Sequence, residues 1–306
     1  MSDGRPRIAV VVVNYRSHGL LRSALDAPSL AAAGIGVFVV DNRSTAAERA
    51  AVGEVCTERG WVMVGAKTNR GFGAGVNQGV EAARRAGYDT FVTVNPDARV
   101  DTPALVELGR AAHASGRCLV APAMVDSAGA AHFRGSLVSM RTGAIRSGWV
   151  AGDDDREWKN WLSGACLAFS DPAFRELGGF DESYFLYWED VDLSRRAVRA
   201  GMDLSLRTDL QIVHDEGGTH GVARARAKSP IYYRYNTRNR LRFAVRNCSR
   251  RELWGWIAAT PRESAQIWLR GGRRQLLTSP GGLAAAVAGT FAGLGAALLT
   301  GLGVPR

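Results

Sequence analysis

The sequence predicts an α/β protein in which a mostly parallel, Rossmann-type sheet is flanked by helices and followed by a C-terminal helical tail. Short apolar runs rich in β-branched residues alternate with helical segments in the first 230 residues. This alternation is typical of parallel strands joined by crossover helices. Later in the chain a basic, aromatic and then uncharged stretch replaces the strand-like runs. We therefore expect one large domain, with functional halves at 1–100 and 101–230, and a helical tail at 231–306.

The N-terminal segment predicts a βαβ unit. Residues 8–13 and 37–40 are apolar runs suited to buried strands, and a helical pattern covers residues 20–33 between them. Each run ends in polar side chains: Asn14 and Tyr15 after the first, Asp41 and Asn42 after the second. Because ligands of open α/β sheets bind beyond the carboxyl ends of the strands, we expect these side chains to contact a ligand. Asp41 suits a hydrogen bond from a base or ribose, with an Asx-turn or helix cap as the alternative.

A glycine-rich segment at residues 69–79 opens a predicted helix that continues to Ala86. Glycines let a backbone approach a ligand closely, and helix N-terminal amides together with Arg70 favour a diphosphate. Gly71 and Asn77 belong to the same predicted site. The glycine spacing does not follow the first strand as a dinucleotide fingerprint would, which excludes a Rossmann oxidoreductase.

The predicted third strand, residues 90–94, ends in Asn-Pro-Asp and so places Asp97 on a turn. A carboxylate there suits a metal-bound diphosphate, because Mg²⁺ and Mn²⁺ take hard oxygen ligands. We expect Asp97 to bind the divalent cation. His214, which ends a later apolar run, is our second ligand, and His220 is a competing choice.

The segment from Gly178 to Arg196 concentrates acids, aromatic residues and a basic pair. Carboxylates hemmed in by aromatic rings lose hydration, which raises their pKa and suits one of them to accept a proton near neutral pH. Asp190 is our candidate base, with Glu189 beside it. The alternative is a capped amphipathic helix whose first turn holds both acids and whose apolar side faces the core.

Taken in order, these motifs resemble an inverting family 2 glycosyltransferase of the GT-A fold, most closely the bacterial rhamnosyltransferase branch. The resemblance covers about residues 7–245. It is carried by the following motifs: Val12 to Tyr15, Asp41 to Ser44, Asn69 to Gly79, Asn95 to Asp97, Ser163 to Ala165, Gly178 to Glu182, Glu189 to Leu193, His214 and Arg238-Asn239. Many enzymes of this fold carry Asp-x-Asp at the metal turn, whereas this chain has Asn95 in place of the first acid. The Asn-Pro-Asp form is familiar in the rhamnosyltransferase-like branch.

The resemblance implies a nucleotide-sugar donor, dTDP- or UDP-linked, bound by the first half of the domain. The implied donor-binding residues are Asn14, Tyr15, Asp41, Asn42, Arg70, Gly71, Asn77, Asn95 and Asp97. Asp41 would read the base, and Asp97 and His214 would hold the metal. Asp190, next to Glu189, would deprotonate the acceptor hydroxyl in a single inverting displacement. Our best guess for the transferred sugar is L-rhamnose from dTDP-rhamnose.

The acceptor site is expected in the second half of the domain, where several aromatic side chains offer flat faces for sugar rings. Small residues after Trp161 would let a sugar approach the backbone. We expect the acceptor to contact Trp161, Gly164, Ala165 and Trp188. Close packing in the core is the alternative for the same residues.

Composition places the protein in a reducing cytoplasm. A chain of 306 residues with 46% hydrophobic content can bury a large core, and its four cysteines show no metal-ligand spacing. The N-terminal residues run into a strand without a secretory apolar segment.

The tail predicts association with an anionic membrane. Residues 221–274 hold 14 Lys and Arg against two Glu, interspersed with Trp254, Trp256 and Trp268, a mixture suited to the membrane interface. Residues 276–305 carry no charge, but their many glycines favour an interfacial or re-entrant helix over a full span. A soluble helix that docks on the domain or on a second subunit of a homodimer is the alternative.

We therefore favour a peripheral protein at the inner face of the cell membrane, acting in cell-envelope polysaccharide synthesis on a saccharide acceptor carried by a polyprenyl diphosphate. Three alternatives remain: a UDP-sugar-dependent transferase for another acceptor such as a natural product, a non-catalytic nucleotide-sugar-binding subunit, and a nucleic-acid-binding protein. The last is disfavoured, because the basic charge is confined to the tail and no nucleic-acid module is legible. A nucleotidyltransferase would leave the Glu189-Asp190 segment without a role.

Overall fold

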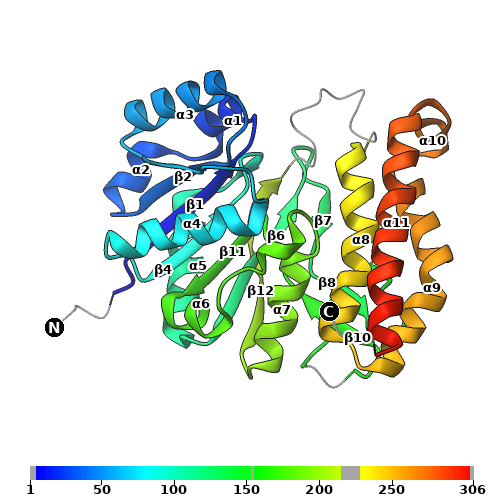
Figure 1. Cartoon of the computed structure of the whole chain (residues 1–306). Coiled ribbons are helices and arrows are strands. Elements are labelled where there is room, and N and C mark those ends of the chain that lie inside the picture. The colour runs from blue at the N-terminus through cyan, green and yellow to red at the C-terminus, as the bar shows by residue number, and fades with distance from the viewer. Residues whose placement is uncertain (1–4, 153–154, 215–227, 304–306) are drawn as a thin grey trace.

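The computed structural model describes residues 5–152, 155–214 and 228–303. Figure 1 shows a central sheet with helices on both faces and a group of C-terminal helices standing along one side of it. His220 and part of the predicted basic segment lie outside the described residues.

Four parallel strands build the first half of the sheet in the order β3-β2-β1-β4. Their bounds are Ile8–Asn14 (β1), Gly36–Asp41 (β2), Val62–Gly65 (β3) and Thr90–Val94 (β4). The apolar runs of β1, β2 and β4 are buried, as their composition predicts. Asn14 pairs in register with Asp41, so the polar ends of β1 and β2 lie side by side.

Two expectations for this half are corrected. The predicted helix over 20–33 is two helices, α1 (His18–Ala24) and α2 (Ala27–Ala32), because Leu25 and Asp26 are extended and Pro28 starts a new first turn. Residues 90–94 form the fourth strand, since the short, partly exposed edge strand β3 precedes them. The remaining helices are α3 (Ala46–Arg59), α4 (Phe72–Arg85) and α5 (Thr102–Ser115).

The second half makes the sheet mixed. Its strands are β5 (Ala98–Arg99), β6 (Cys118–Val125), β7 (Ala131–Phe133), β11 (Cys166–Ser170) and β12 (Asp203–His214). β11 lies antiparallel between β4 and β6, whereas β12 runs parallel to β6. A small antiparallel sheet of β8 (Ser136–Ser139), β9 (Ile145–Ser147) and β10 (Trp158–Trp161) lies beyond. The helices of this half are α6 (Asp171–Leu177), the 3₁₀ turn η1 (Glu182–Tyr184) and α7 (Glu189–Arg199).

The tail consists of α8 (Pro230–Asn247), α9 (Arg250–Leu269), α10 (Arg273–Thr278) and α11 (Pro280–Gly301). A stripe of small residues on α11 packs against α8. A Cβ atom on Gly289 would lie 2.2 Å from the carbonyl oxygen of Arg234, so only glycine permits this close approach. Gly293 also lies close to α8, since a Cβ atom there would be 3.1 Å from the carbonyl oxygen of Arg238.

Among the described residues, α11 is the one helix long and apolar enough to cross a membrane, with a mean hydropathy of 1.8 over its most apolar 18-residue window. Its outer face exposes Phe291 (69%) and Leu302 (65%). Trp256, expected at a membrane interface, is instead fully buried, and its indole N–H donates to the carbonyl of Met140 at 2.7 Å.

Candidate active site

The carboxyl ends of β1 and β2 present buried polar side chains with unused acceptor atoms. Asn14 donates to Glu48 at 2.9 Å, and Asp41 accepts a bond of 2.6 Å from Arg49 Nε. The second oxygen of Asp41 and the Oδ1 atoms of Asn14 and Asn42 are buried and, among the described residues, have no hydrogen-bond partner. Because a buried acceptor without a partner is costly, this edge is suited to receive donors from a ligand.

Glu48 supports the end of β1 although the sequence did not suggest it. It accepts bonds from the side chain of Asn14 and from the backbone and ring of His18. Burial alone would raise the pKa of Glu48, but these hydrogen bonds outweigh burial and lower it, so the carboxylate stays ionised. Tyr15, in contrast, lies largely exposed at the surface.

The glycine segment holds the acidic segment in place. Gly71 has φ +98°, and a Cβ atom there would lie 2.0 Å from the carbonyl oxygen of Phe185, whose oxygen accepts from Phe72 N at 2.8 Å. Asn77 exchanges bonds of 2.9 Å with both backbone groups of Phe180.

These contacts change two of the predicted donor assignments. The second amide bond of Asn77 goes to Glu182 at 3.1 Å, and Arg70 forms an ion pair with the same carboxylate. Asn77 is therefore a positioning residue rather than a free ligand group. Gly71 serves the close approach of two protein segments, while Arg70 remains largely exposed although it is paired with Glu182.

Asp97 and His214 come together although 117 positions separate them, with Asp97 Oδ1 3.2 Å from His214 Nε2. The turn after β4 carries Asp97, and β12 ends at His214, which pairs in register with Ala98. Both are side chains that bind Mg²⁺ or Mn²⁺, so the pair fits the implied cation. No group of three or more His, Cys, Asp or Glu side chains that could hold a metal occurs within the described part of the chain.

Asp190 and Glu189 begin α7 and lie in a desolvated environment. Asp190 accepts from the backbone N–H of Gly164 at 3.1 Å and of Val191 at 2.8 Å. Burial raises the pKa of Asp190. Burial, with the neighbouring charge of Asp190, raises the pKa of Glu189 to about 8. The segment Gly164–Ala165 connects Asp190 to the turn that carries Asp97. Gly164 N–H is bonded to Asp190, and Ala165 O accepts from Asn95 N at 2.8 Å.

Comparisons with known proteins show which proteins this chain resembles. No family model matches the sequence. A segment of 61 residues is 43% identical to the N-acetylglucosaminyl-diphospho-decaprenol L-rhamnosyltransferase of Mycobacterium tuberculosis, but the match spans only 20% of each chain. The hexosyltransferase Agl10 of low-salt glycan biosynthesis in Haloferax volcanii is 20% identical over 215 residues, 68% of this chain and 67% of its own.

Solved structures agree in fold. A mannosyltransferase from Pyrobaculum calidifontis, in complex with GDP-Man and Mn²⁺, aligns over 97% of this chain and 87% of its own, with a TM-score of 0.53 and 17% identity. GalNAc-T7 with UDP, GalNAc and Mn²⁺ aligns over 70% and 44%, with a TM-score of 0.52 and 14% identity. The chain has the GT-A fold of these glycosyltransferases.

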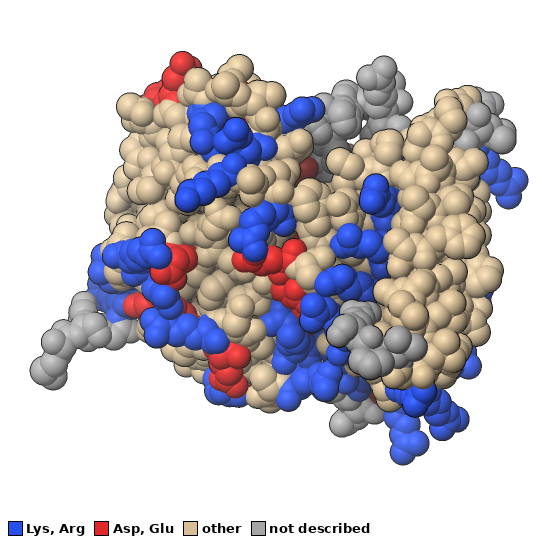
Figure 2. All heavy atoms as spheres, in the orientation of Figure 1, with Lys and Arg blue, Asp and Glu red and all other residues tan. Residues whose placement is uncertain are grey.

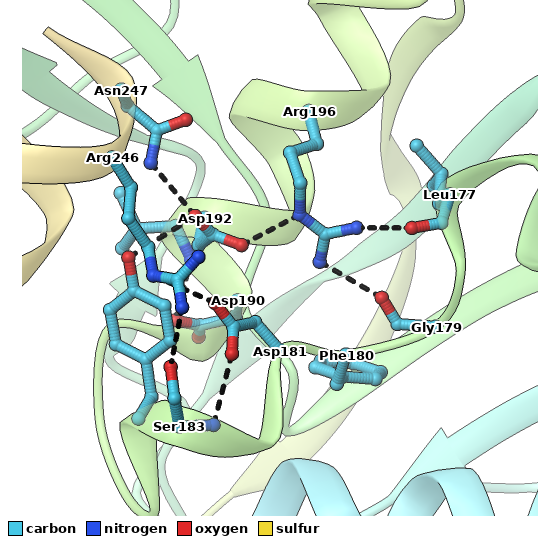
Figure 3. A network of polar contacts seen from close by, with 12 residues as sticks. Leu177, Gly179, Phe180, Asp181, Ser183, Asp190, Asp192, Arg196, Arg246 and Asn247 are labelled. Carbon is cyan, nitrogen blue, oxygen red and sulfur yellow. Dashed lines mark hydrogen bonds and ion pairs between the residues drawn. The ribbon is translucent and has the colours of Figure 1, made fainter. Parts of the chain in front are cut away.

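A buried network fixes the start of α7 (Figure 3). Asp192 accepts from Tyr184 OH at 3.1 Å, from Asn247 at 2.8 Å and from Arg196 Nε at 2.7 Å. Arg196 also donates to the carbonyls of Leu177 and Gly179. The network ties the acidic segment to α8, and it orients Asp190 without contacting it.

The loop before α7 is strained and is held from α8. Phe185, Tyr187 and Trp188 have positive φ angles of 66–76°, which non-glycine residues rarely adopt. The buried amide of Asn239 donates to the carbonyls of residues 184, 186 and 187 at 2.8–2.9 Å. Asn239 thus provides hydrogen bonds to the backbone of the loop that precedes Glu189 and Asp190, and Arg238 adds a further bond to the carbonyl of Tyr184.

The predicted acceptor residues divide into two groups. Trp161 is half-buried with its ring edge against Phe133, while Gly164 contacts Asp190 through its N–H. Ala165 is buried beside them. Trp188 is only 4% exposed and packs on Phe243 and Trp256, so the expectation that it offers a sugar-stacking face is corrected.

Proposed function

We propose that this protein is an inverting glycosyltransferase that moves a sugar from a nucleoside diphosphate donor to a hydroxyl of a glycan or lipid-linked saccharide. The observation that carries the proposal is the segment Gly164–Ala165. Its Ala165 carbonyl is bonded to the turn that bears Asp97, and its Gly164 N–H is bonded to Asp190. The candidate metal ligand and the candidate base are thus both held to one short piece of backbone. We place the donor sugar between Asp97 and Asp190.

The donor nucleoside is assigned to the edge formed by Asn14, Asp41 and Asn42. Their unpartnered oxygens suit N–H and O–H donors of a base and ribose. Arg70 and the start of α4 would attract the diphosphate. A divalent cation held by Asp97 and His214 would neutralise the charge of the departing diphosphate.

In the proposed reaction, Asp190 accepts the proton of the acceptor hydroxyl. The acceptor oxygen forms a bond to the anomeric carbon, and the bond from that carbon to the diphosphate oxygen breaks with its electron pair leaving on the diphosphate. One displacement inverts the configuration. The raised pKa of Glu189, about 8, keeps this neighbour protonated at neutral pH, so that Asp190 is the ionised member of the pair.

The finer assignment is L-rhamnose from a dTDP donor and an acceptor on a polyprenyl diphosphate. Its support is the 61-residue match to a relative whose name includes both the rhamnosyl group and a diphospho-decaprenol. A peripheral position at the inner membrane face agrees with the exposed apolar side of α11. A UDP-sugar-dependent transferase is the competing assignment.

Calorimetry and turnover with Asp190→Asn test the proposal. We expect dTDP or UDP to bind wild type and variant equally, more tightly with Mn²⁺ or Mg²⁺, while sugar transfer falls by about 10²–10⁴-fold because general base catalysis is lost. The matched control is Asp209→Asn, an exposed acid that pairs with Arg207. Wild-type turnover in the Asp190 variant would overturn the base assignment, and failure of every nucleoside diphosphate to bind would overturn the donor site.

A further inference from the structure

Four arginines recur at four-residue spacing on α8: Arg234, Arg238, Arg242 and Arg246. This spacing places their side chains along one helix face. In Figure 2 a column of Lys and Arg lies over α8, beside a broad uncharged surface over α11. The function proposed above uses none of these four side chains.

The row lies against the loop that leads into the candidate active site. Arg238 Nη2 donates to the carbonyls of Ser183 and Tyr184, both at 3.1 Å. Arg242 Nε donates to Ser183 Oγ at 2.8 Å, and Arg246 Nε lies 3.0 Å from Asp181 Oδ2. The bonds of Arg238 go to neutral carbonyl oxygens, and the single carboxylate of Asp181 faces both Arg246 and Arg242, so the row keeps a net positive charge.

Positive charge therefore accumulates along the row. Arg234 is exposed, and its guanidinium has no hydrogen-bond or ion-pair partner in the described ranges of the chain. Burial lowers the pKa of Arg238, and the neighbouring charges of Arg242 and Arg234 lower it further. Like charges at this spacing repel one another, and an anion bound between them would remove the repulsion.

The helix that packs against the row, α11, carries an exposed apolar face. Gly289 and Gly293 of α11 pack on the backbone carbonyls of Arg234 and Arg238. The opposite side of α11 exposes large apolar side chains: Leu283, Phe291, Leu298, Leu299 and Leu302. A cationic row beside such a face is complementary to a molecule that joins a phosphate to a hydrocarbon chain.

We propose that the α8 arginine row binds the diphosphate of a lipid-linked acceptor, while α11 contacts its hydrocarbon chain. This inference rests on the proposed function, since it names the acceptor subsite of the same reaction. Arginine matches phosphate oxygens with paired N–H groups. The row holds residues 183–184, shortly before Glu189 and Asp190, so a sugar on the diphosphate would extend toward the base.

Binding of farnesyl diphosphate, measured by calorimetry at physiological salt, tests the subsite. Inorganic pyrophosphate and farnesol serve as the two halves of this probe. We expect farnesyl diphosphate to bind more tightly than either half, and Arg234→Gln to weaken its binding about tenfold through the loss of a charge-assisted contact. The matched control is Arg262→Gln, an exposed arginine of α9 outside the row, which should leave binding unchanged.

Four results would overturn the inference. Equal weakening by both variants would indicate general attraction of anions, and no weakening by either would exclude the row. If UDP or dTDP displaces farnesyl diphosphate, then farnesyl diphosphate binds in the donor site. Binding to vesicles made of phosphatidylcholine and phosphatidylglycerol is measured as well. If Arg234→Gln weakens vesicle binding as much as it weakens farnesyl diphosphate binding, the row binds the bilayer surface instead. If the arginine effect appears but no nucleoside diphosphate binds, the proposed function fails and the lipid subsite stands.

Discussion

Two neighbouring acids in the candidate active site have distinct protonation behaviour. Glu189 is buried, and its Oε2 atom has no hydrogen-bond partner within the described residues. Its folded-state pKa of about 8 lies above the ordinary value of 4.5. At neutral pH the carboxyl therefore takes up a proton on folding, and the stability that its protonated form provides is fully present below about pH 4.5 and lost as pH rises through about 8.

Glu189→Gln tests this at the residue scale. Because glutamine is neutral at every pH, the melting temperature of the variant should exceed that of wild type by a margin that grows between pH 5 and pH 9. Thermal unfolding at a series of pH values measures it, with exposed Glu54→Gln as the control. A margin independent of pH would show that Glu189 does not retain its proton in the folded protein.

At this scale the sequence predicts residues whose chemistry follows from their place at a strand end or helix start. Asp97 and His214 were paired in this way, and the structure brings them together. Glu48 and Arg49 were not predicted, because an acid and a base on an ordinary amphipathic helix give no sign that they reach Asn14 and Asp41. Such partners depend on how α3 packs beside the sheet.

At the scale of the element, α8 holds the loop that precedes α7. The sequence identified Arg238-Asn239 only as part of the family resemblance, and nothing local shows that Asn239 reaches three carbonyls more than fifty positions away. The mixed order of the sheet escaped prediction for a similar reason. The run at 166–170 has a strand pattern in either direction, and its antiparallel insertion between β4 and β6 depends on tertiary pairing.

Asn239→Ala should destabilise the protein by about 1–3 kcal/mol, because buried carbonyls lose their donor. Turnover should fall as well, since the strained loop sets the position of Asp190. Denaturant unfolding and steady-state kinetics measure the two effects. Asn236→Ala is the matched control, because within the described residues the side chain of Asn236 bonds to its own helix, at Tyr232 O. Unchanged turnover in a destabilised Asn239 variant would show that the loop does not position the base.

At the scale of the whole molecule, the exposed side of α11 is apolar, whereas the neighbouring surface over α8 is rich in Lys and Arg (Figure 2). The sequence predicted an uncharged helical tail, and the structure adds which of its large apolar side chains remain exposed, Phe291 and Leu302 most of all. Trp256 shows the limit of such reasoning, since an aromatic residue among arginines suits an interface and a core equally well. The hydrogen bond from the indole of Trp256 to the carbonyl of Met140 shows that this residue belongs to the core.

The double variant Phe291→Gln, Leu302→Gln should reduce sedimentation with anionic vesicles by at least about tenfold, because full burial of each large apolar side chain contributes roughly 1.5–3 kcal/mol. Val62→Gln, an exposed apolar position on edge strand β3, is the control. An unchanged bound fraction would contradict membrane association. A homodimer in solution that the double variant dissociates would instead assign this face to a second copy of the chain.

The two contacts of α8 have a practical consequence for any shortened form of the protein. One side of α8 receives the glycine stripe of α11, and Asn239 on the same helix keeps the backbone of the loop satisfied. A chain cut before residue 280 would expose Thr237 and Leu241 to water. It would also remove the packing of α11 on α8, the helix that carries Asn239. Catalysis would then be impaired even toward a water-soluble acceptor, so attachment and chemistry are better separated by surface substitutions than by truncation.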